Sequence, residues 1–318
     1  MKARAIAHPN IALIKYWGKR NISLNLPAVS SLSLTLDQFQ TETLVEWGSE
    51  RDRLFLNGSE IQSNEAKRAF QFLDRLDPDR PPCRIVSHNN FPTAAGLASS
   101  SSAFAALALA ASKASGQSHT ETELSILARQ GSGSAARSLS GGWVVWNRGI
   151  QPNGQDSYGR CIAPPDHWDV RMLVAVVSAG RKSVGSTQGM IRSKETSPFY
   201  QNWVDTSEKD VQEAIQAVQK KDLHQLGALM EHSTIKMHAV MMTSRPTIRY
   251  WKPQSLAIIE AVEALRNRGI PCYQTMDAGP NVKILCSAEH AEEIASELSR
   301  ITHPIHILQA GSDAKIIH

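Results

Sequence analysis

The stretch NFPTAAGLASSSSA, from Asn90 to Ala103, decides the fold because it places a proline, a glycine and small residues directly before an apolar segment. Its four serines, Ser99 to Ser102, lead into Ala103–Ala111, which is almost entirely Ala, Leu and Phe and predicts a helix. Small residues let a phosphate approach the backbone, and the free N–H groups of a first helical turn attract anions. An ordinary serine-capped helix start is the alternative, and this stretch alone leaves both open.

The composition limits the classes of protein to which this sequence can belong. A length of 318 residues, with 42% hydrophobic and 20% charged residues, is typical of a globular protein with one or two domains. The longest apolar run is too short to span a membrane, and the start MKARAIAHPN lacks the apolar core of a signal peptide. The net charge of +4 is scattered along the chain, so we expect neither nucleic acid nor a membrane as partner. The four cysteines contain no CxxC pair, which favours reduced thiols and a cytoplasmic location.

The N-terminal half predicts strands with a few helices. The run Ser31–Leu36 alternates with a period of two, which marks a half-buried strand. The pair Asn57-Gly58 predicts a tight hairpin turn. The other expected elements are strands at Ala3–Ala7, Ile11–Ile14, Arg53–Leu56, Glu60–Ile61, Arg84–Ser87 and Trp143–Trp146, and helices from the cap Ser63 to Leu76 and over Glu121–Arg129.

A stretch rich in Pro and Gly, Gly149 to Pro165, separates this half from the rest and places a boundary between domains 1–165 and 166–318. The second half is expected to contain strands at Val170–Val177, Tyr273–Met276, Val282–Cys286 and Pro304–Leu308, and helices at Val184–Arg192, Ser207–Ser233, Gln254–Arg268 and Ala288–Ser299. Its order of strand, helices, two strands, helix and strand indicates a ferredoxin-like α/β sandwich. The predicted fold class is therefore α+β.

Four further segments stand out. The one from Lys182 to Gly189 is a helix start with small residues, and each of the other three has a plain structural alternative. The run from Lys15 to Arg20, KYWGKR, concentrates cations and aromatics, or is an exposed basic loop. The run from Gly131 to Arg137 suits a phosphate or carboxylate, or is a turn between helices. Asp277 follows a predicted strand, where an acid before Ala-Gly-Pro is usually a turn former. Two histidines, His232 and His238, lack the spacing of metal ligands and are expected on a helix surface.

The order of these segments is informative. The relevant stretches are HPNIALIKYWGKR (His8–Arg20), NLPAVSSLSLTL (Asn25–Leu36), NNFPTAAGLASSSSAFAAL (Asn89–Leu107), GSGSAARSLSGG (Gly131–Gly142), STQGM (Ser186–Met190) and MDAGPN (Met276–Asn281). Across almost the whole chain they resemble the mevalonate diphosphate decarboxylase family of the GHMP kinase superfamily, and KYWGKR and GSGSAARS are specific to that branch. The resemblance implies a two-lobed fold. An N-terminal GHMP-kinase-like ATP-binding lobe, 1–165, and a C-terminal ferredoxin-like lobe, 166–318, are expected to enclose the active site.

The resemblance also implies a reaction. Mevalonate 5-diphosphate is expected to be decarboxylated with ATP to isopentenyl diphosphate, ADP, phosphate and CO₂, a step of isoprenoid biosynthesis, by 3-phosphorylation and then elimination. By the resemblance, Asp277 orients the tertiary hydroxyl and takes its proton, and Lys15 keeps that carboxylate ionised. Arg137 is implied to grip the substrate carboxylate.

Binding residues follow from the same resemblance. The substrate diphosphate is expected to contact Tyr16, Lys19, Ser132 and Ser134. The ATP phosphates are expected on the serine-rich loop, at Ala95, Gly96, Leu97, Ala98, Ser99 and Ser100, with Ser31 and Ser33 near the nucleotide and Ser186 in a loop that closes on the phosphates. Mg²⁺ is the expected metal, with Ser100 as its side-chain contact. The family is commonly homodimeric, and a homodimer is expected here.

Three positions depart from the family pattern. Val29 replaces a frequent asparagine, Gly185 replaces one serine of a pair, and either Lys67 or Arg68 is available where the family directs an arginine at the diphosphate. Three other functions stay open: a phosphomevalonate decarboxylase, a mevalonate 3-kinase that stops after phosphoryl transfer, and a catalytically dead anion-binding homologue. The last has no need of Asp277, so the presence of this residue favours an enzyme.

Overall fold

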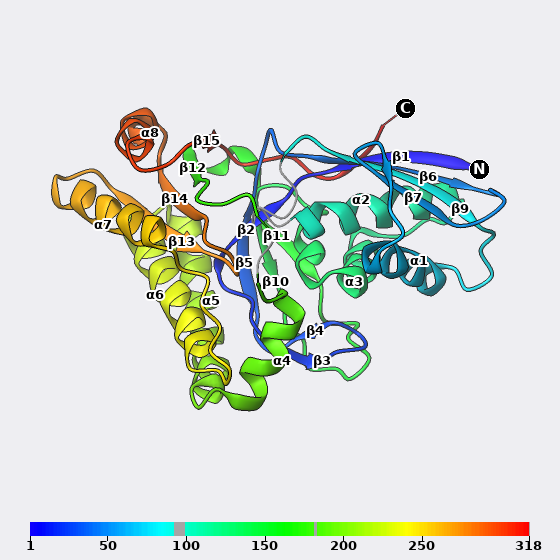
Figure 1. The fold of residues 1–318 in the computed structure, drawn as a ribbon, viewed down its shortest axis with the longest axis horizontal. Helices are drawn as coiled ribbons and strands as arrows, with labels where there is room; N and C mark the ends of the chain where they lie inside the picture. Colours follow the sequence, from blue (N-terminus) through cyan, green and yellow to red (C-terminus); the bar gives the residue numbers. More distant parts are fainter. Residues whose placement is uncertain (92–98, 181–182, 318) are drawn as a thin grey trace.

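The computed structural model describes residues 1–91, 99–180 and 183–317, which form a mixed α/β structure (Figure 1). The strands are β1 (Lys2–Ala7), β2 (Asn10–Ile14), β3 (Lys19–Asn21), β4 (Leu26–Pro27), β5 (Ser31–Thr35), β6 (Thr41–Trp47), β7 (Arg53–Leu56), β8 (Ser59–Glu60), β9 (Cys83–Asn89), β10 (Trp143–Trp146), β11 (Gly159–Ala163), β12 (Val170–Ala175), β13 (Cys272–Met276), β14 (Val282–Ser287), β15 (Ile305–Leu308) and β16 (Lys315–Ile317). The helices are α1 (Asn64–Leu76), α2 (Ser99–Ala114), α3 (Glu121–Gly131), α4 (Ser186–Thr196), α5 (Tyr200–Lys220), α6 (Leu223–Met242), α7 (Pro253–Asn267) and α8 (Ala291–Ser299). Short 3₁₀ turns are η1 (Gly133–Arg137), η2 (Pro165–His167) and η3 (Ala288–His290). None of the helices in the described ranges is both long enough and apolar enough to cross a membrane.

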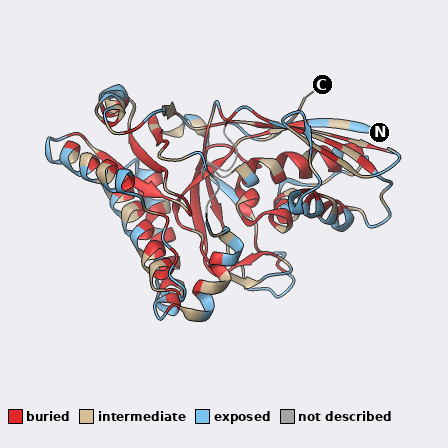
Figure 2. Ribbon diagram, in the orientation of Figure 1, coloured by how far each residue is buried: buried red, intermediate tan, exposed pale blue. Residues whose placement is uncertain are grey.

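The first sheet has the strand order β16-β1-β6-β9-β7-β8, and its neighbours are antiparallel except for β7 and β9. Helix α2 packs against β1 and β6, and its Ala and Leu side chains are buried in a core shared with α1 (Figure 2). Two predictions from turn chemistry are confirmed. Ser63 caps α1 by accepting from the Glu65 N–H, and Asn57-Gly58 has the two positive φ angles, 49° and 84°, of a primed hairpin turn.

The second sheet, β11-β10-β5-β2, lies at the centre of the molecule (Figure 1). All five residues of β5 are buried, so the expectation of a half-buried strand is wrong. One face of β5 packs its leucines into the core beside α5 and α6, while the serines on the other face make hydrogen bonds within the protein. Strand β11 comes from the Pro- and Gly-rich stretch and pairs with β10, so this stretch is partly built into the sheet.

The third sheet has the order β13-β14-β12-β15 and is antiparallel throughout. In chain order these strands are the second, third, first and fourth, which is the arrangement of a ferredoxin-like sheet. Helices α7 and α8 share a core with one face. Helices α5 and α6 share another core with strands of this sheet and with β2 and β5. This shared core joins the two halves of the chain.

The chain returns to the first sheet at its end. After β15, residues 309–314 run along the second sheet, where the Gly142 N–H donates to the Gly311 carbonyl and the Ala314 N–H to the Leu139 carbonyl. Strand β16 then pairs with β1, with Ile317 opposite Arg4 (Figure 1). The sequence did not predict β16, because a strand of three residues is too short to show a period of two.

Candidate active site

A cavity of about 730 Å³ opens where the central sheet, the start of α2, η1, α4 and the turn after β13 meet. Its lining includes Lys15, Lys19, Arg68, Arg137 and Asp277, side chains that come from four separate segments. Four of these five are cations. The cavity is therefore suited to a ligand with several negative charges.

Strand β2 places Lys15 at the cavity. A bulge in its pairing with β5, between Ala12 and Ile14, changes the direction of the strand just before this residue. The Lys15 N–H donates to Ser233 Oγ on α6 at 2.9 Å, and its Nζ donates to the Ala12 carbonyl at 2.8 Å. The side chain is 1% exposed. The alternative of an exposed basic loop is wrong at this position, since Lys15 is buried and both its backbone N–H and its Nζ donate hydrogen bonds.

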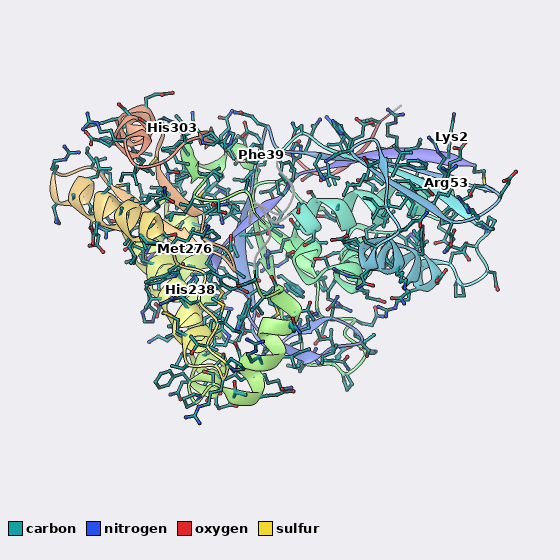
Figure 3. All side chains as sticks on the ribbon, in the orientation of Figure 1. Lys2, Phe39, Arg53, His238, Met276 and His303 are labelled. Atoms are coloured by element: carbon teal, nitrogen blue, oxygen red, sulfur yellow. The ribbon has the colours of Figure 1, made fainter. Side chains whose placement is uncertain are left out.

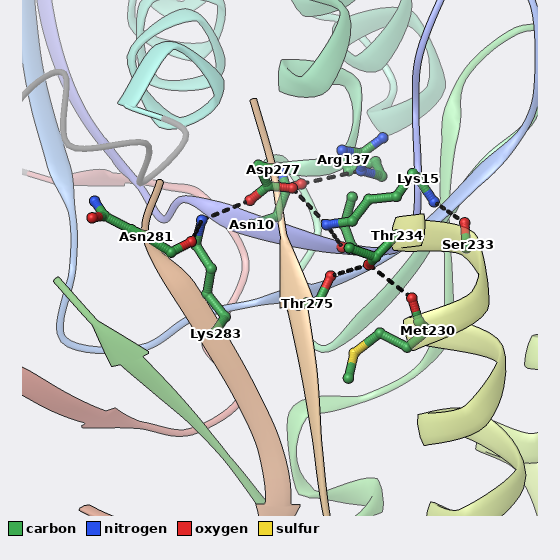
Figure 4. Close-up of polar contacts among 11 residues, drawn as sticks. Asn10, Lys15, Arg137, Met230, Ser233, Thr234, Thr275, Asp277, Asn281 and Lys283 are labelled. Carbon is green, nitrogen blue, oxygen red and sulfur yellow. Dashed lines mark hydrogen bonds and ion pairs between the residues drawn. The ribbon is translucent and has the colours of Figure 1, made fainter. Parts of the chain in front are cut away.

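Asp277 stands in the turn between β13 and β14, where its carboxylate meets two buried lysines (Figure 4). Lys15 Nζ lies 2.7 Å from Oδ1, and Lys283 Nζ lies 3.0 Å from Oδ2. The turn is tied down by Asn281, whose Oδ1 accepts from the backbone N–H groups of Val177 and Ser178. The Asp277 side chain is 26% exposed, so one edge of the carboxylate faces the cavity.

The electrostatics of this group follow from burial and charge. Burial by itself raises the pKa of the Asp277 carboxyl, but the two lysines outweigh it and hold the pKa below its ordinary value. Burial lowers the pKa of Lys15 to about 8, although Asp277 opposes that change. Asp277 is therefore a fixed anion at neutral pH, and Lys15 titrates close to the physiological range.

Arg137 ends η1 and is 2% exposed. Its Nε donates to Asn10 Oδ1 at 3.1 Å and its Nη1 to Ser31 Oγ at 2.6 Å, and the guanidinium lies over the Trp146 ring. Burial lowers the pKa of Arg137 to about 10, which leaves the group charged at neutral pH. A guanidinium held in this way, on the lining of the cavity, is ready to bind a planar anion.

Ser31 and Ser33 were expected near the nucleotide. Both are 0% exposed, and neither belongs to the described lining of the cavity. Ser31 accepts from Arg137, and Ser33 donates to the Val144 carbonyl. In this structure their hydroxyls are thus occupied inside the protein, and Ser31 acts on the site through Arg137.

Tyr16, Lys19, Ser132 and Ser134 all line the cavity. Burial, followed by the charge of Arg68, lowers the pKa of Lys19 to about 8, and its Nζ donates to Asn25 Oδ1. Gly133 is required here, because a Cβ would lie 2.8 Å from the Tyr16 hydroxyl and 2.9 Å from the Trp146 ring.

Arg68 also lines this part of the cavity and donates to the Gly131 carbonyl at 3.0 Å, whereas Lys67 lines a separate hollow beside the β7–β8 hairpin. The geometry therefore favours Arg68 over Lys67 as the additional cation of the site.

Helix α2 begins at Ser99, four residues earlier than expected, so the serines form its first turn instead of preceding it. Ser99 and Ser100 line the cavity, and Ser132 Oγ donates to Ser100 Oγ at 3.2 Å. The start of α2 and the 3₁₀ turn η1 thus share one hydroxyl network. The expected nucleotide contacts Ala95, Gly96, Leu97 and Ala98 lie outside the described residues.

Helix α4 covers another side of the cavity. Gly185 and Ser186 line it at the start of the helix, and Tyr250 Oη donates to the Val184 carbonyl just before them at 2.7 Å. Gly189 packs against Trp17, whose ring atoms would lie 3.0 Å from an added Cβ. The small residues of STQGM therefore let α4 approach the KYWGKR segment closely.

Three residues near the carboxylate were missed by the sequence analysis: Asn10, Lys283 and His238. His238 is 1% exposed, so its expected place on a helix surface is wrong. Its Nδ1 accepts from Trp251 Nε1 at 3.0 Å, and burial followed by the charge of Lys15 lowers its pKa to about 3. The neutral imidazole lies beside Met276 (Figure 3), which is the residue before Asp277 in the sequence. A lysine within the apolar run Val282–Cys286 was the signal that could have identified Lys283.

Two protein-family models match the chain in order along its length. Residues 7–159 match the diphosphomevalonate decarboxylase-like N-terminal domain, and residues 172–315 match the mevalonate 5-diphosphate decarboxylase C-terminal domain. The diphosphomevalonate decarboxylase mvd1 of Aspergillus fumigatus is 39% identical over 328 residues, covering 95% of this chain and 81% of the relative. The human diphosphomevalonate decarboxylase is 38% identical over 299 residues, covering 86% and 74%.

Solved structures agree with these matches. MDDEF in complex with MVAPP, AMPPCP and magnesium has a TM-score of 0.93 at 40% identity, covering 100% of this chain and 99% of that chain. Mevalonate diphosphate decarboxylase from Staphylococcus aureus has a TM-score of 0.93 at 38% identity, covering 100% and 98%. The expected fold class, an α+β GHMP-kinase-like fold with a ferredoxin-like C-terminal sandwich, is confirmed. The chain belongs to the diphosphomevalonate decarboxylase family.

Proposed function

We propose that this protein catalyses the ATP-dependent decarboxylation of mevalonate 5-diphosphate to isopentenyl diphosphate, ADP, phosphate and CO₂. The observation that carries the proposal is the ionised Asp277 carboxylate, held by Lys15 at 2.7 Å on the wall of a cationic cavity. Family membership supports the choice of reaction, and MDDEF is described with MVAPP, AMPPCP and magnesium together.

In the first step, the 3-hydroxyl oxygen of the substrate attacks the γ-phosphorus of ATP, and ADP leaves. The hydroxyl proton passes to Asp277, the carboxylate on the cavity wall. A carboxylate of low pKa is a weak base for a free alcohol. Its main contribution is therefore to orient the O–H group and to accept the proton as the O–P bond forms.

In the second step, phosphate leaves from C3 and the C–C bond to the substrate carboxylate breaks. The electron pair of that bond becomes the new C=C bond, and the carboxylate departs as CO₂. Arg137 is placed to grip the carboxylate and fix the direction of the breaking bond. Asn10 and Ser31 hold the guanidinium for this task through its Nε and Nη1.

We assign the diphosphate to Tyr16, Lys19, Ser132 and Ser134, which all line the cavity, with Arg68 as an additional contact. The ATP phosphates are assigned to the first turn of α2, where Ser99 and Ser100 line the cavity, and to Ser186, which also lines it. The donor chemistry fits, because hydroxyls, the N–H groups of first helical turns and cations line the same cavity. Mg²⁺, with Ser100 as its protein contact, would supply charge neutralisation between the phosphates.

We also propose a division into a nucleotide-binding lobe, 1–165, and a C-terminal lobe, 166–318, with the site between them. The two matched domains, 7–159 and 172–315, support a boundary in this region. A homodimer is proposed from the resemblance to the family. A cytoplasmic location is proposed from the four cysteines, none of which is paired within the described residues.

Turnover of three substrates tests the function. The protein is incubated with ATP, Mg²⁺ and mevalonate, its 5-phosphate or its 5-diphosphate, while ADP, phosphate and CO₂ are followed. We expect equal yields of the three products, and only with the diphosphate. ADP without CO₂ would assign a 3-kinase instead, preference for the 5-phosphate would assign the monophosphate enzyme, and no turnover would leave an anion-binding homologue.

A further inference from the structure

A second buried lysine, Lys283, contacts the carboxylate at the atom that Lys15 does not reach (Figure 4). It is the second residue of β14, and its side chain is 0% exposed. Its Nζ lies 3.0 Å from Asp277 Oδ2 and 3.4 Å from the Asn281 carbonyl. Lys283 does not belong to the described lining of the cavity, but it contacts Asp277, which does.

The groups around Asp277 come from several elements. Lys15 directly follows β2, Lys283 belongs to β14, and Arg137 belongs to η1, whereas His238 on α6 is kept neutral by burial. The Asp277 carboxylate thus lies between two buried ammonium groups and contacts one with each oxygen. Because like charges in a water-poor region repel each other strongly, the protonation of Lys15 depends on the charge of Lys283.

We propose that Lys283 is a positioning residue for the reaction: it fixes Oδ2 of Asp277 and, with Lys15, sets the charge of this buried triad. With Oδ2 held by Lys283 and Oδ1 by Lys15, the carboxylate cannot rotate, and its exposed edge stays directed at the cavity. The effect on turnover rests on the function proposed above. The charge coupling within the triad does not, and it can be measured without turnover.

Removal of the Lys283 charge has a defined effect on Lys15. The positive charge of Lys283 lowers the pKa of Lys15, and Asp277 raises it. An uncharged residue at position 283 removes the first influence. It also ends the competition of Lys283 with Lys15 for the Asp277 carboxylate. Both changes favour the protonated form of Lys15. Its titration midpoint therefore moves upward from about 8, by about one pH unit.

The experiment compares the wild type with Lys283→Met, which keeps the length of the side chain, and Lys283→Arg, which keeps its charge. Competitive acetylation of lysines with acetic anhydride between pH 6 and 10, read by mass spectrometry, gives the midpoint of each lysine without turnover. Lys19 is the internal control, because its lowered pKa comes from burial and Arg68. If Lys283→Met does not fold, Lys283→Gln is measured in the same way.

We expect the Lys15 midpoint to rise in the uncharged variants and to stay near 8 in Lys283→Arg, while the Lys19 midpoint stays unchanged in all. With mevalonate 5-diphosphate, kcat falls by about tenfold or more in the uncharged variants, the KM for this substrate is unchanged, and Lys283→Arg recovers part of the loss. A Lys15 midpoint that does not rise, or that rises together with that of Lys19, overturns the inference. A wild-type protein that turns over no substrate overturns the proposed function alone, since the midpoints still report on the triad.

Discussion

Replacement of Asp277 by asparagine leaves two buried lysines facing a neutral amide. Their side chains are 1% and 0% exposed and lie 2.7 and 3.0 Å from the carboxylate that is lost. Removing one partner of a buried ion pair costs about 3–5 kcal/mol. Lys15 can limit this cost by losing its proton. From its ordinary pKa of 10.5, that costs about 5 kcal/mol at pH 7, at about 1.4 kcal/mol per pH unit. We therefore expect Asp277→Asn to lower the free energy of unfolding by about 3–5 kcal/mol at pH 7.

The loss depends on pH in a direction that can be worked out. In the wild type, Lys15 has a pKa of about 8 when folded and 10.5 when unfolded. The unfolded state thus binds more protons than the folded state. The free energy of unfolding therefore rises with pH above the pKa of folded Lys15. Without Asp277 the pKa of folded Lys15 falls further, so this rise begins at a lower pH. The difference in the free energy of unfolding between the variant and the wild type then shrinks by about 1.4 kcal/mol per pH unit. This continues until about pH 8, where the wild type begins to gain stability as well.

Urea unfolding of both proteins at pH 6, 7 and 8 measures this difference. Asp79→Asn is the matched control, because Asp79 is exposed in the turn after α1. Turnover in the same preparations is expected to fall by about 10²–10⁴-fold. A loss of stability below about 1 kcal/mol at every pH, the range of surface ion pairs, would refute the energetic reasoning. Turnover above about a tenth of the wild-type value would remove Asp277 from proton transfer.

Three further substitutions have distinct signatures. Ser100→Ala removes a donor to the ATP phosphates, so the KM for ATP should rise by about tenfold or more, and unchanged steady-state constants would exclude Ser100 from the site. Ser31→Ala removes the acceptor of the 2.6 Å hydrogen bond from Arg137. We expect kcat to fall by about tenfold with the KM for ATP unchanged, whereas a raised KM for ATP would place Ser31 at the nucleotide after all. Gly189→Ala brings a methyl group within 3.0 Å of the Trp17 ring and should lower turnover by about tenfold through displacement of α4. Wild-type kinetics would show that α4 can shift without consequence.

Local signals in the sequence were strong where the chemistry of a turn or cap determines the backbone. Ser63 and Asn57-Gly58 are such cases, because a side-chain cap and two positive φ angles depend only on neighbouring residues. The convergence of Lys15 and Asp277 could be predicted from the family resemblance and not from spacing, since 262 positions separate them.

The missed features depend on packing across the fold. The hydroxyl of Ser31 could face a ligand or the protein, and only the position of Arg137 decides between them. Lys283 stands in a strand whose alternation is hidden because both faces are buried. His238 was placed at a helix surface because it lacks the spacing of a metal ligand, and that test says nothing of burial. In the fold, both α5 and β13 pack against its helix α6.

The pairing of β16 with β1 has a consequence for how the molecule is made. Strand β1 leaves the ribosome long before its partner, residues 315–317, because the two strands lie far apart along the chain. Until those residues emerge, β1 presents an open edge of unpaired N–H and C=O groups, which is a template for association with other chains. Contacts between such distant positions also form slowly, because the chain loses the entropy of closing a long loop before these contacts stabilise it. We therefore expect completion of the first sheet to be a late event in folding, with the nascent chain open to aggregation at β1 until it occurs.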